Sequence, residues 1–195
     1  YERAKGGNCV FIGRGGFAIL KDVPGCYAVR LVSTDEIRTQ RLMKEFSWTE
    51  KQAQQRIDES DSNRLGFHKS FFNLENDDPV NYHATLNTGL IDIETAVECI
   101  ADVLKKTITP QKEQQGAKKI AELLAAQRVV SILLFEYKLP VNFLHAVIDG
   151  DVLSLHGVAD SAAIAEQAVS AAAKILPEKK VKSCISIVQD FKPYS

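Results

Sequence analysis

The chain has 195 residues, a formal net charge of −1, 45% hydrophobic and 25% charged residues, the composition of an ordinary globular protein in which disorder is not expected. The basic residues form no long run, so we expect no nucleic-acid partner. No segment approaches the roughly 20 apolar residues that cross a bilayer, so we expect no transmembrane segment. Scattered cysteines that stay reduced are typical of a cytoplasmic protein, which is the location we expect. The four cysteines are scattered and form no C-x-x-C pair, so we predict free thiols and no zinc site.

The first organised stretch is an apolar run that breaks into glycines. Residues 9–12 read Cys-Val-Phe-Ile and are followed by Gly-Arg-Gly-Gly at 13–16. This pattern predicts a buried strand and a tight turn. Ligands of open α/β sheets bind beyond the carboxyl ends of strands, so Arg14 is a candidate for docking an anion. The alternative, a turn whose arginine points into water, stays open from these residues alone.

Two helices are expected next, each with charged residues on one face. Residues 27–32 read as a second strand, and Ser33 or Thr34 can cap the helix that carries Arg38 and Arg41 three positions apart. The Ser-Trp-Thr-Glu sequence at 47–50 is a capping box that predicts a new helix as far as residue 71. Asp61 and Arg64 share a face of that helix. A solvated charged face with weak ion pairs is the alternative interpretation.

A third strand is predicted at residues 82–88, followed by a helix that Asp92 caps. The order strand, helix, helix, strand, helix is typical of parallel βα units. Three strands make a thin sheet, and a parallel sheet needs both faces covered. We therefore expect an α/β fold that is the later part of a larger domain.

Residues 7–104 resemble the cytidylate-kinase-like family of nucleoside monophosphate kinases. The resemblance rests on V-F-I-G-R-G at 10–15, V-S-T-D-E-I-R-T-Q-R at 32–41, D-E-S-D-S-N-R at 58–64 and L-N-T at 86–88. It implies a partial parallel P-loop-kinase-like sheet and transfer of phosphate from ATP, with Mg²⁺, to a nucleoside monophosphate, CMP being the first candidate. By matching position it implies that Arg14, Asp61 and Arg64 bind the nucleotide or its phosphate. It also implies that Arg38 and Arg41 act catalytically near the donor phosphates or the lid. Phosphoryl transfer depends on such positioning and charge stabilisation.

The chain departs from the family pattern at three places. Gly15 stands where cytidylate kinases carry aspartate, Ile57 stands where they carry arginine, and Arg56 is one residue out of register. The phosphate-cradling sequence G-x-x-x-x-G-K-[ST] does not occur. We expect that loop to lie upstream of Tyr1, and we expect this chain alone to be inactive.

A second, α+β unit is predicted after a polar linker. The boundaries are 1–106 for the partial kinase-like domain, 107–116 for the linker and 117–195 for the second domain. Within the latter, the pattern predicts a helix at 117–137, strands at 144–148 and 152–158 around Asp149-Gly150-Asp151, an alanine-rich helix at 161–176 and a strand at 181–188. This is an α-β-β-α-β unit.

The stretch D-G-D-V-L-S-L-H-G at 149–157, within residues 117–191, resembles the BON domain. The resemblance implies a binding or regulatory module for phospholipid, a small ligand or a protein. His145 and His156 lie on facing strands without a neighbouring third ligand, so we predict surface histidines and no metal site. Unpaired strand edges make a homodimer plausible. Two functions remain open: a nucleotide-kinase-like protein with a regulatory module, or a non-catalytic binding protein with a degenerate kinase-like half.

Overall fold

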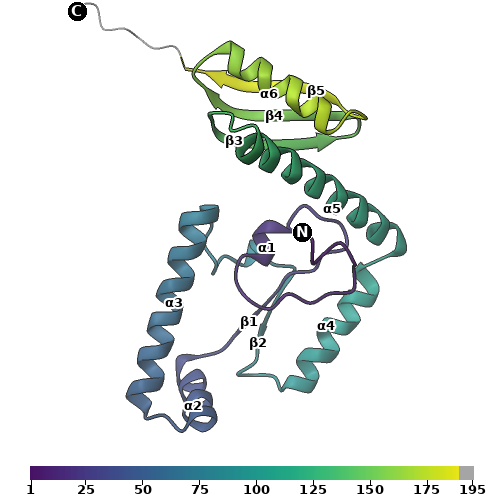
Figure 1. Ribbon diagram of the computed structural model, residues 1–195. Coiled ribbons are helices and arrows are strands. Elements are labelled where there is room, and N and C mark those ends of the chain that lie inside the picture. Colours follow the sequence, from purple (N-terminus) through teal and green to yellow (C-terminus); the bar gives the residue numbers. More distant parts are fainter. Residues whose placement is uncertain (189–195) are drawn as a thin grey trace, which may run out of the picture. The chain divides into compact units, whose positions relative to one another are not determined.

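The computed structural model describes residues 1–188, so the last seven residues of the predicted 117–195 domain lie outside the described residues. The chain divides into two compact units. The larger consists of residues 9–116, and the smaller combines residues 1–8 with those from 117 onward. The elements are drawn in Figure 1.

The larger unit is built on a parallel pair of strands, β1 (Val29–Val32) and β2 (Ala84–Asn87), in the register Val29 to Ala84. Its other elements are α1 (Gly16–Ile19), α2 (Asp35–Phe46), α3 (Glu50–Phe72), the 3₁₀ turn η1 (Pro79–Asn81) and α4 (Ile93–Thr107). Helices α2 and α3 both lie in the connection from β1 to β2, as Figure 1 shows. This part of the chain has the mixed α/β character that the sequence predicts.

Side-chain caps fix where the helices of this unit begin. Thr34 Oγ1 accepts from Ile37 N at 3.5 Å at the start of α2, and Asp92 Oδ1 accepts from Thr95 N at 2.7 Å at the start of α4. The capping box of α3 begins two residues later than predicted. Thr49 and Gln52 form it, whereas Ser47 has a φ of 55° and ends α2. A residue in the left-handed region cannot be a helix N-cap, which has extended geometry.

The predicted strand at residues 9–12 is wrong. These residues have no regular secondary structure, and the side chains of Val10 and Ile12 are 88% and 98% exposed. In the described part of the chain, β1 has β2 as its sole hydrogen-bonded neighbour. A β-prone run becomes a strand only when another strand pairs with it and a layer covers it, and local sequence supplies neither.

The polar stretch predicted as a linker is largely helical. Helix α5 spans Pro110–Ser131, so it begins seven residues before the predicted start at Ala117. Thr109 Oγ1 accepts from Lys112 N at 3.3 Å, which makes Thr109 a cap and Pro110 the first helical residue. Proline is favoured there because the first helical N–H needs no partner within the helix.

The smaller unit has the predicted α-β-β-α-β order. Helix α5 ends in the π turn η2 (Ile132–Glu136), and β3 (Val141–Asp149), β4 (Val152–Ala159), α6 (Ala162–Ile175) and β5 (Lys180–Ile187) follow. Strand β4 is central, antiparallel to β3 and parallel to β5. The register slips between Asn142 and His145, where Phe143 has a φ of 54°.

One face of this sheet forms the core. Its fully buried side chains are Val129, Leu133, Leu153 and Leu155. Helix α6 packs on that face through alanines, of which Ala168 and Ala172 are completely buried. Small side chains allow the helix to lie close to the sheet. Residues of the opposite sheet face alternate with the core residues and are exposed or half-buried.

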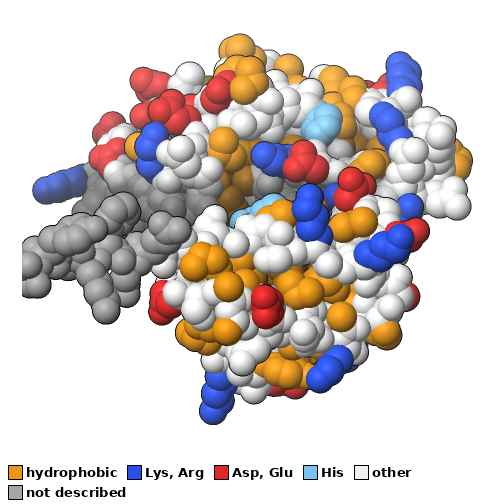
Figure 2. Space-filling view, turned by 90° about the horizontal axis from the view of Figure 1, so that it is seen from above, with side chains coloured by type: hydrophobic (Ala, Val, Ile, Leu, Met, Phe, Trp, Pro, Cys, Tyr) orange, Lys and Arg blue, Asp and Glu red, His pale blue; other side chains and the backbone are white. Residues whose placement is uncertain are grey.

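Within residues 1–188 no helix is both long and apolar enough to cross a membrane. On the face drawn in Figure 2, Lys and Arg side chains are interspersed with Asp and Glu side chains. That mixture agrees with the net charge of −1.

Candidate anion-binding site

Arg41 is anchored at the carboxyl end of the parallel strands. Its Nη1 donates to Thr88 Oγ1 at 3.0 Å, and its Nη2 donates to the Thr88 carbonyl at 2.6 Å. Thr88 directly follows β2, and its hydroxyl donates to the carbonyl of Val32, the last residue of β1, at 3.2 Å. Arg41 therefore stands at the sheet edge where open α/β folds bind ligands.

Asp61 of α3 joins the two helices by holding Arg38 of α2. Arg38 Nη1 and Nη2 donate to the two carboxylate oxygens of Asp61 at 2.7 and 2.8 Å. Arg38 Nη1 also donates to Asp35 Oδ1 at 3.0 Å. The sequence placed Asp61 with Arg64, but its main partner lies 23 positions away on another helix.

This ion pair shifts both groups toward their charged forms. Hydrogen bonds from Arg38 hold the pKa of the Asp61 carboxyl below its ordinary value, with the charges of Arg38, Arg64 and Arg30 adding to the effect against the opposing cost of burial. The same bonds to Asp61 raise the pKa of Arg38. Asp61 and Asp35 both lie within ion-pair distance of the Arg38 guanidinium.

Arg64 has fewer ion-pair partners than Arg38, which pairs with both Asp35 and Asp61. Its Nη1 lies 3.5 Å from Asp61 Oδ1, and its side chain is 41% exposed. A guanidinium has five N–H donors, so most of those of Arg64 stay available to an incoming anion. Of the two arginines that pair with Asp61, Arg64 has more freedom to change partner.

Among the described residues, Arg14, like Arg41, forms no ion pair with Asp61. Its guanidinium stands 5.4 Å from the ring centroid of Phe67, a cation–π contact on α3. Phe67 follows Arg64 by three positions and is therefore close to it on the helix surface. Gly15, with a φ of 82°, brings the loop against α3, where an added Cβ would lie 3.0 Å from the Phe72 ring. The close packing of the loop against α3 thus explains why Gly15 stands where cytidylate kinases carry aspartate.

Sequence reasoning missed Arg30, which is 19% exposed and projects from β1. It donates to the Asn76 carbonyl and to Asp77, and lies 5.7 Å from the Tyr82 ring centroid. Its position in the middle of an apolar strand was the available signal, since arginine is seldom buried without partners.

His68 of α3 is a second buried residue near the charged groups that sequence reasoning missed. It is 2% exposed, and its Nδ1 lies 2.8 Å from the Arg64 carbonyl. A carbonyl only accepts, so Nδ1 carries the proton and Nε2 is a bare acceptor. That Nε2 is buried with no hydrogen-bond partner among the described residues. The spacing of 61, 64 and 68 places it on the same face as the charged pair.

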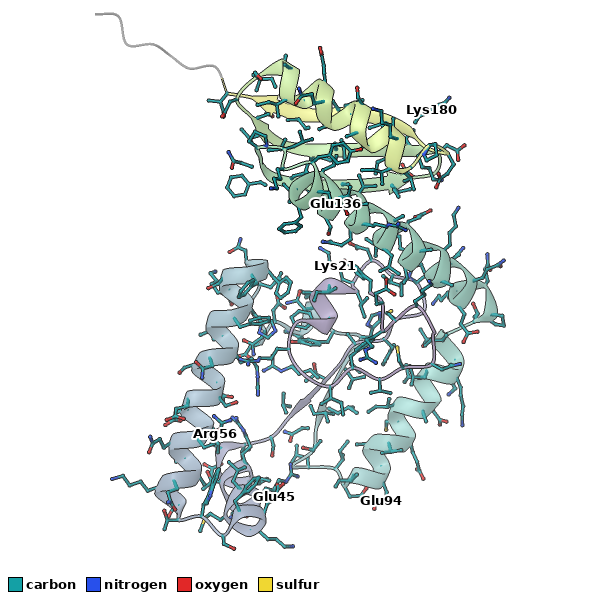
Figure 3. The ribbon with its side chains drawn as sticks, viewed as in Figure 1. Lys21, Glu45, Arg56, Glu94, Glu136 and Lys180 are labelled. Carbon is teal, nitrogen blue, oxygen red and sulfur yellow. The ribbon has the colours of Figure 1, made fainter. Side chains whose placement is uncertain are left out.

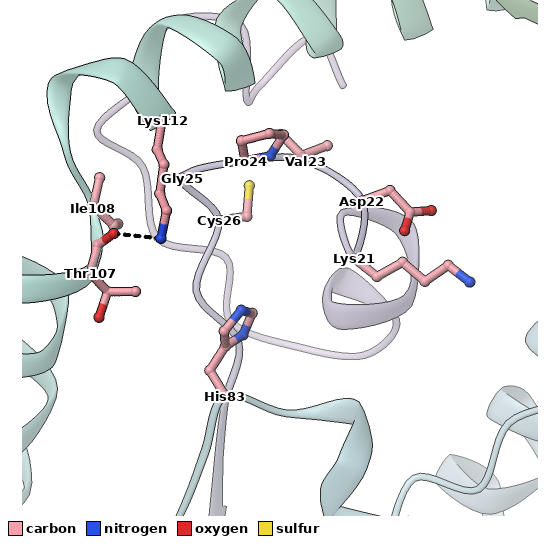
Figure 4. Close-up of a pocket in the computed structure, with 10 residues that line it drawn as sticks. All are labelled: Lys21, Asp22, Val23, Pro24, Gly25, Cys26, His83, Thr107, Ile108 and Lys112. Carbon is pink, nitrogen blue, oxygen red and sulfur yellow. Dashed lines mark hydrogen bonds between the residues drawn. The ribbon is translucent and has the colours of Figure 1, made fainter.

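A separate cavity of about 310 Å³ lies at the amino-terminal end of the strands. Its lining, drawn in Figure 4, includes Cys26, His83 and Lys112. Lys112 Nζ donates to the Thr107 carbonyl at 2.9 Å, and His83 Nδ1 accepts from Ala28 N at 3.0 Å. Burial raises the pKa of the Cys26 thiol, so it is not an activated nucleophile. This cavity and Arg41 lie at opposite ends of β1 and β2.

Between residues 1 and 188, no group of three or more His, Cys, Asp or Glu side chains is placed to hold a metal ion. All four cysteines are free thiols.

The comparisons with known proteins bear on the first half of the chain. The model of the cytidylate kinase-like family matches residues 2–90. No curated protein matches. The crystal structure of an uncharacterized protein from Eubacterium ventriosum is similar over 46% of this chain, with 22% sequence identity and a TM-score of 0.44, and the chain spans 50% of the length of that protein. The arginine cluster thus lies within the stretch that is similar to cytidylate kinase-like proteins.

Proposed function

We propose that the larger unit binds the phosphate of a nucleoside monophosphate, as the acceptor side of a nucleotide-kinase-like site. The proposal rests on two groups of contacts: Asp61 holds Arg38 and borders Arg64, and Arg41 is anchored on Thr88 at the carboxyl end of the parallel strands. The match of residues 2–90 to cytidylate kinase-like proteins favours a nucleotide over other anions, with CMP as the first candidate.

The contacts suggest different roles for the arginines. Arg41, anchored on Thr88, and Arg64, which keeps free donors, contact the phosphate in this proposal. Arg14, whose guanidinium lies over the Phe67 ring, contacts the phosphate or the base. Arg38 has its charge balanced by Asp61 and Asp35, so it acts as a positioning residue that orients α2 against α3. Planar guanidinium groups suit this task because they bind phosphate oxygens with two parallel hydrogen bonds.

ATP and Mg²⁺ are the cofactors that the resemblance to cytidylate kinases implies. The described residues do not fit them, because the sequence contains no G-x-x-x-x-G-K-[ST] loop and residues 1–188 hold no cluster of metal ligands. Acceptor binding is therefore the property to test in this chain.

The experiment is calorimetric titration of the chain with CMP, with cytidine as the ligand that lacks the phosphate. Replacing Arg64 by Gln removes charged hydrogen bonds worth about 1.5 to 3 kcal/mol, so we expect Kd to rise about 10- to 100-fold. Arg41→Gln is expected to act likewise. Arg56→Gln is the matched control, because Arg56 lies on the same helix (Figure 3), is 57% exposed and approaches Glu59 at 4.0 Å.

Unchanged CMP affinity in both Arg64→Gln and Arg41→Gln contradicts the proposal. So does equal affinity for CMP and cytidine, because the phosphate then contributes nothing.

The smaller unit suggests a second candidate function, a BON-like binding or regulatory module. Its support is the α-β-β-α-β order with helix α6 on one sheet face and the other face not covered by it. If phospholipid is the ligand, the chain sediments with vesicles of mixed neutral and acidic phospholipids. Recovery of all protein in the supernatant contradicts that ligand.

A further inference from the structure

Two histidines face each other across the smaller unit's sheet. His145 of β3 is paired directly with His156 of β4, and both lie on the sheet face opposite the core. We call this the open face. His145 is exposed and His156 is half-buried, so solvent reaches the pair.

The two imidazole rings are close and nearly parallel. Their centroids are 4.9 Å apart and their planes differ by 10°. Directly opposed residues of an antiparallel pair have Cβ atoms about 4.5 to 5.5 Å apart, so the sheet itself holds the side chains at this spacing. Folding of the sheet therefore already holds the two imidazoles close together, before any metal ion binds.

A hydrogen bond sets which nitrogen of His145 is available. Nδ1 lies 3.1 Å from the carbonyl oxygen of Phe143 and must be the donor. In the neutral ring, Nε2 is then the nitrogen whose lone pair can bind a metal ion. Metal-binding histidines are typically oriented in this way, with the second ring nitrogen donating to a backbone carbonyl. The bulge that gives Phe143 its φ of 54° is what brings that carbonyl next to His145.

We propose that His145 and His156 form a two-imidazole chelate for a borderline divalent cation such as Ni²⁺, Cu²⁺ or Zn²⁺. A metal–nitrogen bond is about 2.0 to 2.1 Å long, so the two ligating nitrogens must come within about 3 to 4 Å of each other. The rings are stacked with their centroids 4.9 Å apart, so both side chains must rotate until their in-plane nitrogen lone pairs converge on the metal ion. Imidazole suits these cations, whereas Mg²⁺ and Ca²⁺ prefer oxygen.

This proposal departs from the sequence-based prediction that His145 and His156 are surface histidines and form no metal site. Two protein ligands leave the other coordination positions to water, and this agrees with the absence of a three-ligand group in residues 1–188. Cys184 of β5 is paired with His156 and is the nearest thiol in the strand order. Lys182, two positions earlier on β5, adds a positive charge to the open face and opposes cation binding.

The test is titration of the full chain with Ni²⁺, with the side-chain resonances of all four histidines followed by NMR. Paramagnetic Ni²⁺ is expected to broaden the signals of His145 and His156 well before those of His68 and His83. Replacing either partner, in His145→Asn or His156→Asn, is expected to weaken binding at least tenfold, because one imidazole cannot chelate. The Cys184→Ser variant is expected to bind as the parent does.

Several results overturn the proposal. They are equal broadening of all four histidines, unchanged Ni²⁺ affinity in both asparagine variants, and loss of binding in Cys184→Ser. Amide spectra of each variant identify any that fails to fold, and the parent chain's own broadening pattern still decides the question in that case.

Discussion

Replacing Asp61 by Asn tests whether one carboxylate holds α2 against α3. The amide has nearly the shape of the carboxylate but lacks its charge, and it keeps one acceptor oxygen in place of two. It therefore breaks one of the two bonds to Arg38, at 2.7 and 2.8 Å, and removes the attraction of Arg64.

The expected loss of stability follows from the exposure of the pair. Exposed ion pairs contribute about 0.2 to 1 kcal/mol, whereas removing one partner of a buried pair costs about 3 to 5 kcal/mol. The Arg38 side chain is 27% exposed and that of Asp61 is 44% exposed. Solvent therefore screens the pair, and the range for exposed ion pairs applies. We expect a loss of about 1 kcal/mol, which lowers Tm by about 4 to 8 °C for a unit of this size.

The pH dependence of this loss has a definite sign. The pKa of Asp61 is lowered in the folded chain, so its contribution is fully present above the unfolded value of about 3.9 and disappears as pH falls through the lower, folded value. The difference in stability between the parent and Asp61→Asn is therefore constant from about pH 5 to 8. The difference shrinks below about pH 4, where the Asp61 carboxylate becomes protonated in the unfolded and then in the folded parent chain.

The single tryptophan provides the assay. Trp48 lies between α2 and α3 and stacks on Phe46 with ring centroids 4.7 Å apart, so its fluorescence during urea unfolding reports on this pair of helices. Asp58→Asn is the control, because Asp58 is on α3 and accepts from Gln54 Nε2 at 3.0 Å, a bond that an amide can replace. Equal stability of Asp61→Asn and the parent at pH 7, or a difference that persists unchanged at pH 3, refutes the reasoning.

Two further substitutions test the helix start and the smaller unit's core. Thr49→Ala removes the capping box of α3 and should lower the free energy of unfolding, followed by Trp48 fluorescence, by about 1 kcal/mol. Thr49→Ser should retain most of the stability. Equal losses in the two variants contradict the assignment of the cap. Leu153→Ala empties a completely buried position and should cost about 2 to 5 kcal/mol in thermal melts followed by circular dichroism. Val147→Ala, at a position 45% exposed on β3, should cost less than about 0.5 kcal/mol, and similar costs in the two variants contradict the assigned core.

Features that depend on a few neighbouring residues were predictable from the sequence. Thr34 and Asp92 cap helices because their side chains reach a backbone N–H three positions ahead, a reach that the sequence spacing specifies. The turn at Asp149-Gly150-Asp151 is equally local, since Gly150 takes the left-handed φ of 54° that such turns need. The start of α5 was missed because Pro110 ends one helix pattern and also suits the first position of the next.

Features that depend on distant partners were not predictable. Residues 9–12 have the composition of a strand, but the sequence does not say whether another strand pairs with them. The pairing of Arg38 with Asp61 depends on how α2 and α3 pack, whereas Arg64 is found by counting along one helix. The contact of Arg14 with Phe67 likewise needs the loop to fold back on α3.

The central claim is that Arg41 and Arg64 bind the phosphate of a nucleotide. The most direct measurement is the arginine side-chain NMR spectrum of the chain during addition of CMP, with cytidine added in a parallel experiment. We predict that the signals of Arg41 and Arg64 shift with CMP and not with cytidine, while that of Arg56 stays in place. If no arginine signal shifts, or if Arg56 shifts as much as Arg64, the phosphate does not bind at this cluster.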